Sequence, residues 1–401
     1  MHMRRVGILV IVVALIAGTV GCGSPPTKHY LIVLSTEGGK VTLPGEDAFL
    51  YDEGTVVNLV AQADEGCHFV SWTGNVSTIA NVEAATTTIT MNDNYFIYAI
   101  FGLEIRDWYD LDSIRDNMVG NHTLMNDLDS TNPGYEELAS PAASGGKGWQ
   151  SIGTWSLSAF TGAFDGQGHE IRDLFINRPN ESPVGLFGFT GKGGVIKDIG
   201  LVNVTVTGYY YVGALVGFNN GIITNSYTTG NVSGTAGMVG GLAGKNTDTV
   251  DHSYSTASVS GVVNVGSLVG DNWGGTVNNS YAIGSATGFS CVGGLVAYSN
   301  NGTISDSYST GSVTGYEEAG GLVGRGEDDT VTNSFWDIET SGQSISAGGT
   351  GKTTVEMHDI STFLGVFWGI VAVTNSSVRN PTCIWNIVNN TTYTFLSWQP
   401  V

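Results

Sequence analysis

Acidic side chains are the residues of this 401-residue chain whose types could support chemistry. Asp165, Asp198, Asp306 and the run Glu327-Asp328-Asp329 would, if grouped on one surface, suit acid/base cleavage of a polysaccharide or binding of calcium. Asp165 precedes Gly166-Gln167-Gly168, which favours a turn, and the acidic run occupies a loop position. No carboxylate recurs on one face of the repeat described below. We therefore expect these residues to cap turns or face solvent, and we predict no catalytic residue.

Metal, nucleotide and disulfide chemistry is also poorly supported. The seven histidines include no pair at positions i and i+4, and Cys67, Cys291 and Cys383 are widely separated, which favours buried free thiols. Gly351-Lys352-Thr353 is similar to the end of a phosphate-binding loop, but Ser346 stands where such a loop needs its first glycine. We expect no metal and no cofactor.

A fixed repeat must position whatever surface the protein presents. Five aromatic residues, each preceded by a serine, recur at intervals of 27 residues, and five leucines recur at intervals of 26 or 27. Such a period indicates a stack of similar units, each too small to bury an apolar face alone. The two rows are Tyr227, Tyr254, Tyr281, Tyr308 and Phe335, and Leu215, Leu242, Leu268, Leu295 and Leu322.

Each unit predicts three short strands, separated by an Asn/Gly turn and a glycine corner. When each strand stacks on its equivalent one coil along, the result is a parallel β-helix, here of about six to seven coils. A propeller blade needs a longer unit, and a leucine-rich repeat needs more leucines and an asparagine ladder. The fold class we predict is therefore all-β, a β-helix with a helical N-terminal cap, preceded by a small β-rich domain.

Strand alternation predicts which side chains face the interior of each coil. Ile223, Asn225 and Tyr227 share one parity and are expected inside, whereas Ser226 and its equivalents are expected to face outward. The position before each serine leaves two alternatives. It is either a buried hydrogen-bonded ladder or a turn residue at a bend that breaks the alternation. Its residues are Asn225, His252, Asn279, Asp306 and Asn333.

The N-terminus predicts export. Arg4 and Arg5 precede an apolar run that is too short for an ordinary membrane span, and small residues follow. Thr19-Val20-Gly21-Cys22 resembles the bacterial lipobox, which implies that Cys22 becomes the lipidated first residue of the mature protein. An ordinary cleaved signal is the alternative. We expect a protein anchored to the membrane through its N-terminal lipid and facing outside the cytoplasm.

The charge of the chain restricts its partners. The formal net charge is −21, and removal of the two leader arginines would make it about −23. Nucleic acids and anionic lipids need clustered Lys and Arg, so we expect neither as a partner. Only 13% of the residues are charged, and the abundance of glycine fits a turn-rich β protein.

We divide the chain into six segments. These are a leader (1–22), a tether (23–29), a β-rich domain (30–102), an N-terminal cap and loop (103–148), a β-helix (149–340) and a C-terminal cap (341–401). Trp108, Leu111 and Ile114 lie at helical spacing and predict a helix over 107–118. A strand is expected over 124–128, a loop over 129–148 and one short helix over 353–364.

Two segments resemble known families of surface proteins. Gly38-Gly39-Lys40-Val41-Thr42, with Gly66-Cys67-His68-Phe69-Val70-Ser71-Trp72, resembles the divergent repeats related to the internalin B-repeat, which implies a small β-rich spacer. Gly241-Leu242-Ala243-Gly244 and Gly321-Leu322-Val323-Gly324, each followed by a Ser-aromatic pair, resemble the GLUG motif of bacterial and archaeal surface proteins. Some members of that family are IgA-cleaving metalloproteases, but this chain has no His-Glu-x-x-His, so that activity does not transfer.

The function we predict is that of a non-enzymatic cell-surface lipoprotein, a β-helical scaffold for adhesion, binding or envelope structure. A surface glycan or a protein is its expected ligand. The alternative is a carbohydrate-active or carbohydrate-binding β-helix, with sugar-stacking candidates at Trp149, Trp155, Tyr209, Tyr210, Tyr211 and Trp273.

Overall fold

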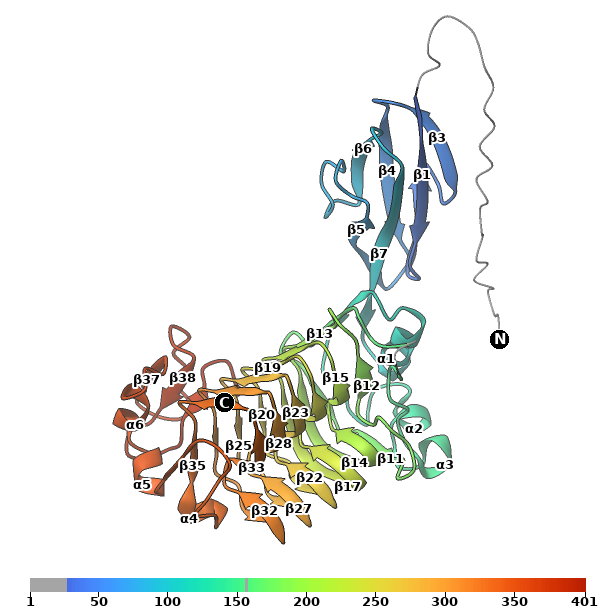
Figure 1. Cartoon of the computed structure of the whole chain (residues 1–401). Coiled ribbons are helices and arrows are strands. Elements are labelled where there is room, and N and C mark those ends of the chain that lie inside the picture. The colour runs from blue at the N-terminus through green and yellow to red at the C-terminus, as the bar shows by residue number, and fades with distance from the viewer. Residues whose placement is uncertain (1–26, 156–157) are drawn as a thin grey trace, which may run out of the picture.

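The computed structural model describes residues 27–155 and 158–401, which form a small β domain joined to a long β-helix (Figure 1). The predicted fold class is confirmed: the chain is nearly all β, and the β-helix has about six turns. Within the described ranges no helix is long and apolar enough to cross a membrane. Cys22 and the rest of the predicted leader lie outside the described residues.

The N-terminal domain packs two sheets against one apolar core that includes Leu31, Leu59, Trp72 and Phe101. Alternate side chains of its strands are buried, as in a sheet with one solvated face. The strands are β1 (Lys28–Ser35), β2 (Gly39–Leu43), β3 (Ala48–Asp52), β4 (Val56–Ala63), β5 (Cys67–Gly74), β6 (Thr86–Thr90) and β7 (Tyr95–Ile105).

The sheet of this domain continues into the β-helix. Strand β7 pairs in parallel with β8 (Asn121–Leu124), which pairs with β9 (Ala163–Asp165), the first strand of one β-helical face. A Cβ on Gly102 would lie 1.4 Å from the Asn121 carbonyl oxygen, so only glycine permits this approach of β7 and β8. The two domains are therefore joined by paired strands and not by a linker.

A buried histidine fastens the same junction. His122 Nδ1 accepts a hydrogen bond from the Leu103 amide at 3.2 Å, while its Nε2 lies 2.8 Å from the Asn117 carbonyl. The Asn117 side chain in turn donates to the carbonyl oxygens of Glu37 and Phe101 in the N-terminal domain. Because one ring nitrogen accepts and the other donates, the imidazole is bound in its neutral form.

Short helices close the N-terminal end of the β-helix (Figure 1). Trp108, Leu111 and Ile114 are fully buried in the β-helix core, as their spacing predicted. The helix predicted over 107–118 is shorter in the structure, because the α-helix ends at Ser113 and a 3₁₀ turn follows. Strand β8 begins three residues before the predicted strand. The loop predicted over 129–148 contains two helices. The elements are α1 (Trp108–Ser113), η1 (Ile114–Asp116), α2 (Tyr135–Leu138) and α3 (Ala143–Gly146).

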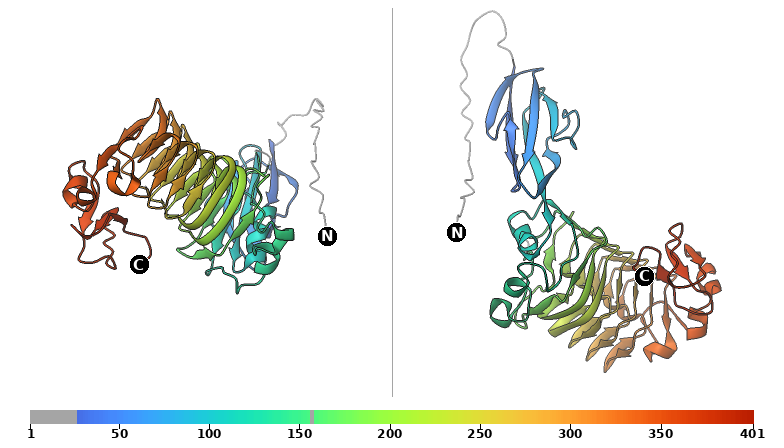
Figure 2. Two further views of the ribbon diagram at one scale, coloured as in Figure 1. Left: turned by 90° about the horizontal axis from the view of Figure 1, so that it is seen from below. Right: turned by 180° about the vertical axis from the view of Figure 1, so that it is seen from behind.

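Three parallel faces form the β-helix, whose coils stack into one column (Figure 2). The first face continues the β8–β9 sheet through β13 (Val195–Lys197), β16 (Ile222–Thr224), β19 (Thr249–Asp251), β24 (Thr276–Asn278), β29 (Thr303–Ser305) and β34 (Thr330–Thr332). The second contains β12 (Phe187–Thr190), β15 (Val216–Asn219), β18 (Ala243–Asn246), β23 (Val269–Trp273), β28 (Val296–Asn300) and β33 (Val323–Glu327).

The third face has two long strands, β14 and β17, with shorter strands in the coils before and after them. Its strands are β10 (Glu170–Arg172), β11 (Phe175–Asn177), β14 (Gly200–Gly213), β17 (Tyr227–Gly240), β20 (Tyr254–Ser255), β21 (Ser258–Ser260), β22 (Val263–Gly266), β25 (Tyr281–Ala282), β26 (Ala286–Thr287), β27 (Ser290–Gly293), β30 (Tyr308–Ser309), β31 (Val313–Thr314), β32 (Glu317–Gly320), β35 (Phe335–Asp337) and β36 (Thr350–Lys352).

Aliphatic side chains fill the interior of the coils. All five repeat leucines are fully buried there, together with Ile223, Val250, Val277 and Ile304, which pair in register from coil to coil. Each leucine lies at the bend between the third face and the second, where its side chain reaches the axis of the stack. Burying such a side chain contributes about 1.5–3 kcal/mol.

The position before each serine is a turn residue, which decides between the two alternatives. Asn225, His252, Asn279, Asp306 and Asn333 all have left-handed backbones, with φ between 44° and 48°. Asn, Asp and His tolerate this region better than most residues. The bend reverses the alternation, so the serines point into the coil and the aromatic residues point out.

Two expectations about facing were therefore wrong. Ser226, Ser253, Ser280 and Ser307 are fully buried, not outward-facing. Each hydroxyl donates to the carbonyl two residues earlier, and from Ser253 onward each also accepts from the serine amide one coil back. Ser280, for example, donates to the Asn278 carbonyl at 2.6 Å and accepts from the Ser253 amide at 3.1 Å. The aromatic row, expected inside, lies on the outer side of the third face in a separate apolar cluster.

Residues 353–401 form an arm that covers the aromatic row. The four tyrosine rings stack 4.8–5.0 Å apart and within 5° of parallel. Trp398 contacts the first two rings, Trp385 the next two, and Trp368 contacts Phe335. The predicted single helix over 353–364 is two, although its N-cap is Thr353 with a capping box to Glu356. The last elements are α4 (Ile338–Ser341), α5 (Thr354–Met357), α6 (Ile360–Leu364), β37 (Ile370–Ala372), β38 (Trp385–Ile387) and β39 (Phe395–Leu396).

A buried asparagine ladder runs along the turn after the second face. Thr190, Asn219, Asn246, Asn272 and Ser299 are buried, and each bonds its neighbour one coil along at 2.6–3.4 Å. The asparagine amides also donate to turn carbonyls, each of which accepts a main-chain amide of the next coil as well. Sequence analysis placed these asparagines in a turn and did not anticipate the ladder.

Replacing one ring of the stack should loosen the arm. Tyr281 is stacked between two rings and contacts Trp385, and its hydroxyl donates to Gln399 at 2.8 Å. Tyr281→Ala should cost about 3–5 kcal/mol of unfolding free energy. Hydrogen exchange should increase in residues 353–401 more than in the N-terminal domain. An unchanged exchange rate in the arm would contradict this packing.

Ser280→Ala tests the corrected facing. The substitution leaves the buried Ser253 amide without its acceptor, which should cost about 1–3 kcal/mol. An outward-facing serine would cost under about 0.5 kcal/mol, so thermal or urea unfolding separates the two arrangements.

The junction histidine should make stability depend on pH. Burial lowers the pKa of His122 from 6.5 to about 4. The unfolded chain therefore takes up this proton near pH 6.5, whereas the folded chain resists it until about pH 4, so stability falls as pH decreases between these values. The full effect is about 3 kcal/mol. In urea unfolding at pH 7 and 4.5, His122→Gln should lose less stability between the two pH values than wild type. An equal loss would mean that His122 does not contribute.

Candidate functional site

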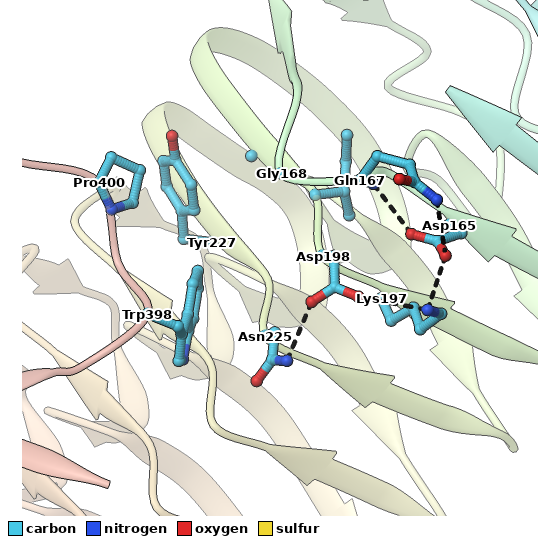
Figure 3. A pocket seen from close by; sticks show the side chains of 11 residues that line it. Asp165, Gln167, Gly168, Lys197, Asp198, Asn225, Tyr227, Trp398 and Pro400 are labelled. Carbon is cyan, nitrogen blue, oxygen red and sulfur yellow. Dashed lines mark hydrogen bonds and ion pairs between the residues drawn. The ribbon is translucent and has the colours of Figure 1, made fainter. Parts of the chain in front are cut away.

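One pocket of about 620 Å³ lies where the first coils meet the end of the arm (Figure 3). One wall is aromatic, formed by Tyr227 and Trp398, and the facing wall is polar. The floor is backbone of Ile199 and Gly200. The complete lining is Asp165, Gln167, Gly168, Lys197, Asp198, Ile199, Gly200, Asn225, Tyr227, Trp398 and Pro400.

The polar wall is an ion-paired network. Lys197 Nζ lies 2.6 Å from Asp165 Oδ2 and 3.4 Å from Asp198 Oδ2. Asp165 also accepts from the Gln167 amide at 2.9 Å, and Asp198 accepts from Asn225 Nδ2 at 2.9 Å. The hydrogen bond and charge of Asp165, with Asp198, raise the pKa of Lys197, so the amine is held in its charged form.

Turn geometry places these side chains. Gln167, Asp198 and Asn225 all have left-handed backbones, with φ of 54°, 54° and 46°. A Cβ on Gly166 would lie 2.3 Å from the Asp198 carbonyl oxygen, so glycine is needed where this turn lies against the next coil. The Asp165 turn expected from the sequence is present, and it forms one side of a pocket.

The aromatic wall is fixed from behind. Tyr227 stacks on Tyr254 and its hydroxyl donates to Glu170, which also pairs with Arg172. Burial, and next the bond to Glu170, raise the pKa of Tyr227, so its hydroxyl stays protonated. Trp398 is tilted against Tyr227 and Tyr254, with centroids 6.4 and 5.9 Å away.

This arrangement suits binding better than acid/base catalysis. Hydrolysis by paired carboxylates needs one of them protonated and free to donate. Asp165 and Asp198 instead share one lysine and accept further hydrogen bonds, so their oxygens are already engaged. Within residues 27–155 and 158–401 no group of three or more His, Cys, Asp or Glu side chains lies together as metal ligands would.

The other acidic candidates lie far along the stack. Asp306 accepts from Asn333 Nδ2 at 3.1 Å in the turn row. Glu327 pairs with Arg325, Asp328 is a left-handed turn residue, and Asp329 accepts from the Gly302 amide at 2.9 Å and Ser299 Oγ at 3.0 Å. The structure therefore brings together Asp165 and Asp198 but none of the others.

Apart from Trp149, the sugar-stacking candidates are linked to one another by ring contacts and through Phe218 and Lys245. Trp149 is fully buried in the core and donates to the Leu186 carbonyl, so it cannot stack on a ligand. Trp155 is half exposed but packs on Phe189, Phe218 and Tyr211. Tyr209 is half exposed and contacts Tyr210, which itself lies against Tyr211.

Trp273, also half exposed, stands beside a charged pair on the second face. Lys245 Nζ lies 4.8 Å from its ring centre and 3.0 Å from Asp271 Oδ2. Burial raises the pKa of Asp271, and Lys245 opposes that rise. Lys245, Asp271 and Lys197 were not predicted from the sequence, because the residue type at their positions changes from coil to coil. Trp398 was not predicted either, because it lies outside the repeat.

Family comparisons agree with both resemblances. Residues 29–104 match the family described as the divergent InlB B-repeat domain. Residues 208–233 and 290–314 match the GLUG motif. These matches confirm the families that the sequence resembles, while the lipoprotein signal stays a prediction.

Among curated proteins, the chain is 31% identical over 224 residues to "Halomucin" of Haloquadratum walsbyi, which covers 51% of this chain and 2% of that protein. It is 40% identical over 84 residues to a "Putative Gly-rich membrane protein" of Evansella cellulosilytica, covering 20% of this chain and 10% of that protein. The chain thus spans a small part of either relative.

Among solved structures, an "IgA1 Protease" aligns with a TM-score of 0.43 and 16% identity, covering 78% of this chain and 27% of that one.

Proposed function

We propose that the protein is a non-enzymatic surface scaffold, in which the N-terminal domain holds the β-helix away from a membrane-anchored N-terminus for adhesion or binding. The observation that carries the proposal is the shared sheet. Because β7, β8 and β9 pair directly, the N-terminal domain and the β-helix form one stiff body, as a spacer with a presented surface requires. Relatives named as a halomucin and a membrane protein support a location at the surface.

The second candidate function is carbohydrate binding, and the pocket at Tyr227 and Trp398 favours it. An aromatic wall opposite carboxylate and amide groups suits a ligand with one apolar face and several hydroxyls. Cleavage of a polysaccharide is less well supported, because Lys197 and other hydrogen-bond donors already engage both pocket carboxylates.

Anchoring can be tested at Cys22. If this cysteine carries the lipid, Cys22→Ser should abolish lipid attachment and release the protein from the membrane fraction, since a single residue supplies the anchor. Intact-mass spectrometry of the wild-type protein is the direct measurement. Cleavage at another position with no lipid would contradict the anchor.

The absence of catalysis can be tested with a panel of neutral and acidic polysaccharides. The full chain in mild detergent should release no new reducing ends and no unsaturated product from any of them. Product formation by wild type that Asp165→Asn or Asp198→Asn abolishes would overturn the scaffold proposal and identify the pocket as an active site.

A further inference from the structure

We propose that the pocket binds a single neutral pyranose ring at the end of a glycan, which packs against Trp398 opposite the polar wall. This inference rests on the proposed function, since it assumes that the protein binds and does not cleave.

The aromatic row ends at the pocket. Tyr254 and Tyr281 each have a stacked tyrosine on both sides. Tyr227 is the first ring of the row, and its one stacked tyrosine is Tyr254. Of the rings in the row, only Tyr227 lines the pocket. The row therefore ends at the pocket, although Tyr227 itself is buried there, with 6% of its surface exposed.

Gly200 explains why the row stops there. Gly200 lies one coil before Tyr227 and pairs in register with it. The same position carries an aromatic ring in the coils from Tyr227 to Phe335. A Cβ on Gly200 would lie 2.5–2.6 Å from the Tyr227 ring and hydroxyl. A side chain there would displace the ring, so glycine keeps both the ring and the pocket beside it.

The arm supplies a second aromatic surface and holds it in place. Gln399 Oε1 accepts from the Tyr281 hydroxyl at 2.8 Å, and Arg379 Nη2 donates to the Pro400 carbonyl at 2.8 Å. Gln399 and Pro400 are the two residues that follow Trp398 in the sequence. The indole is thus positioned before any ligand arrives, which reduces the entropy cost of binding.

The opposite wall matches the hydroxyl groups of a sugar. Asp198, Asn225 and Gln167 offer acceptors and amide donors across from the rings (Figure 3). A pyranose has a C–H face for an aromatic ring and hydroxyls at its edge, so it fits between such walls. A volume of about 620 Å³ lies within the usual range for small-ligand sites.

Charge selects against acidic sugars. The pocket carries two carboxylates and one lysine, and the whole chain carries a formal charge of −21. A uronate or sialate would be repelled by the carboxylates of the pocket and by the negative charge of the chain. The hydroxyl groups of a neutral hexose would instead donate hydrogen bonds to Asp198 and Asp165.

Binding can be measured with methyl glycosides of glucose, galactose, mannose and N-acetylglucosamine, with methyl glucuronide as the acidic probe. Calorimetry or ligand-observed NMR on the full chain in mild detergent should show saturable binding of at least one neutral glycoside and none of the glucuronide. Asp198→Asn should weaken it at least about tenfold through loss of a charged acceptor. Trp398→Ala should weaken it similarly, and Trp273→Ala, a half-exposed tryptophan outside the pocket, should leave it unchanged.

Three results would overturn the proposal: no saturable binding of any neutral glycoside, stronger binding of the glucuronide, or binding that Trp273→Ala abolishes while both pocket variants retain it. Asp198→Asn keeps the arm intact, so it remains informative even where Trp398→Ala releases residues 353–401. Loss of sugar binding without polysaccharide cleavage would reject the pocket assignment alone, whereas cleavage would reject the scaffold function.

Discussion

The direction of the side chains in the β-helix depends on the left-handed residue that precedes each serine. With φ between 44° and 48°, the residues before the serines turn the chain and reverse the direction of every side chain that follows. The small hydroxyl then enters the coil, where it bonds the backbone of its neighbour, and the large ring is placed outside. An outer row of rings must be covered, and residues 353–401 provide the cover. The pocket forms where the end of this arm, at Trp398 and Pro400, lies beside Tyr227 and the first coils.

Much of this architecture could be predicted from the sequence. The 27-residue period indicated coils, the buried leucines were identified from their spacing, and the two surface-protein families were recognised from short motifs. The facing of the serines and tyrosines was wrong because alternation was extended through Asn225 and its equivalents as though the strand were continuous. The residue types in that row, Asn, His and Asp, did indicate a turn, since these residues adopt left-handed backbones more readily than most others.

The pocket could not be predicted in the same way. Asp165 and Asp198 were considered as candidates, but Trp398 is more than 200 residues away in sequence and belongs to the non-repeating arm. A period reports which residues are equivalent between coils and contains no information on where a non-repeating segment folds back. The role of His122 at the junction could not be predicted either, because its partners are main-chain groups of Leu103 and Asn117.

The arm has a consequence for how the β-helix unfolds. In a simple solenoid each coil interacts with its neighbours alone, so the end coil can fray independently and stability is close to a sum of nearest-neighbour terms. Here Trp368, Trp385 and Trp398 connect Phe335 at one end of the row to Tyr227 at the other. Five coils along the stack are thereby coupled to a single non-repeating segment. Melting should consequently be cooperative over this region, and the protein should resist the gradual end-to-end loosening that is available to an unbraced repeat array.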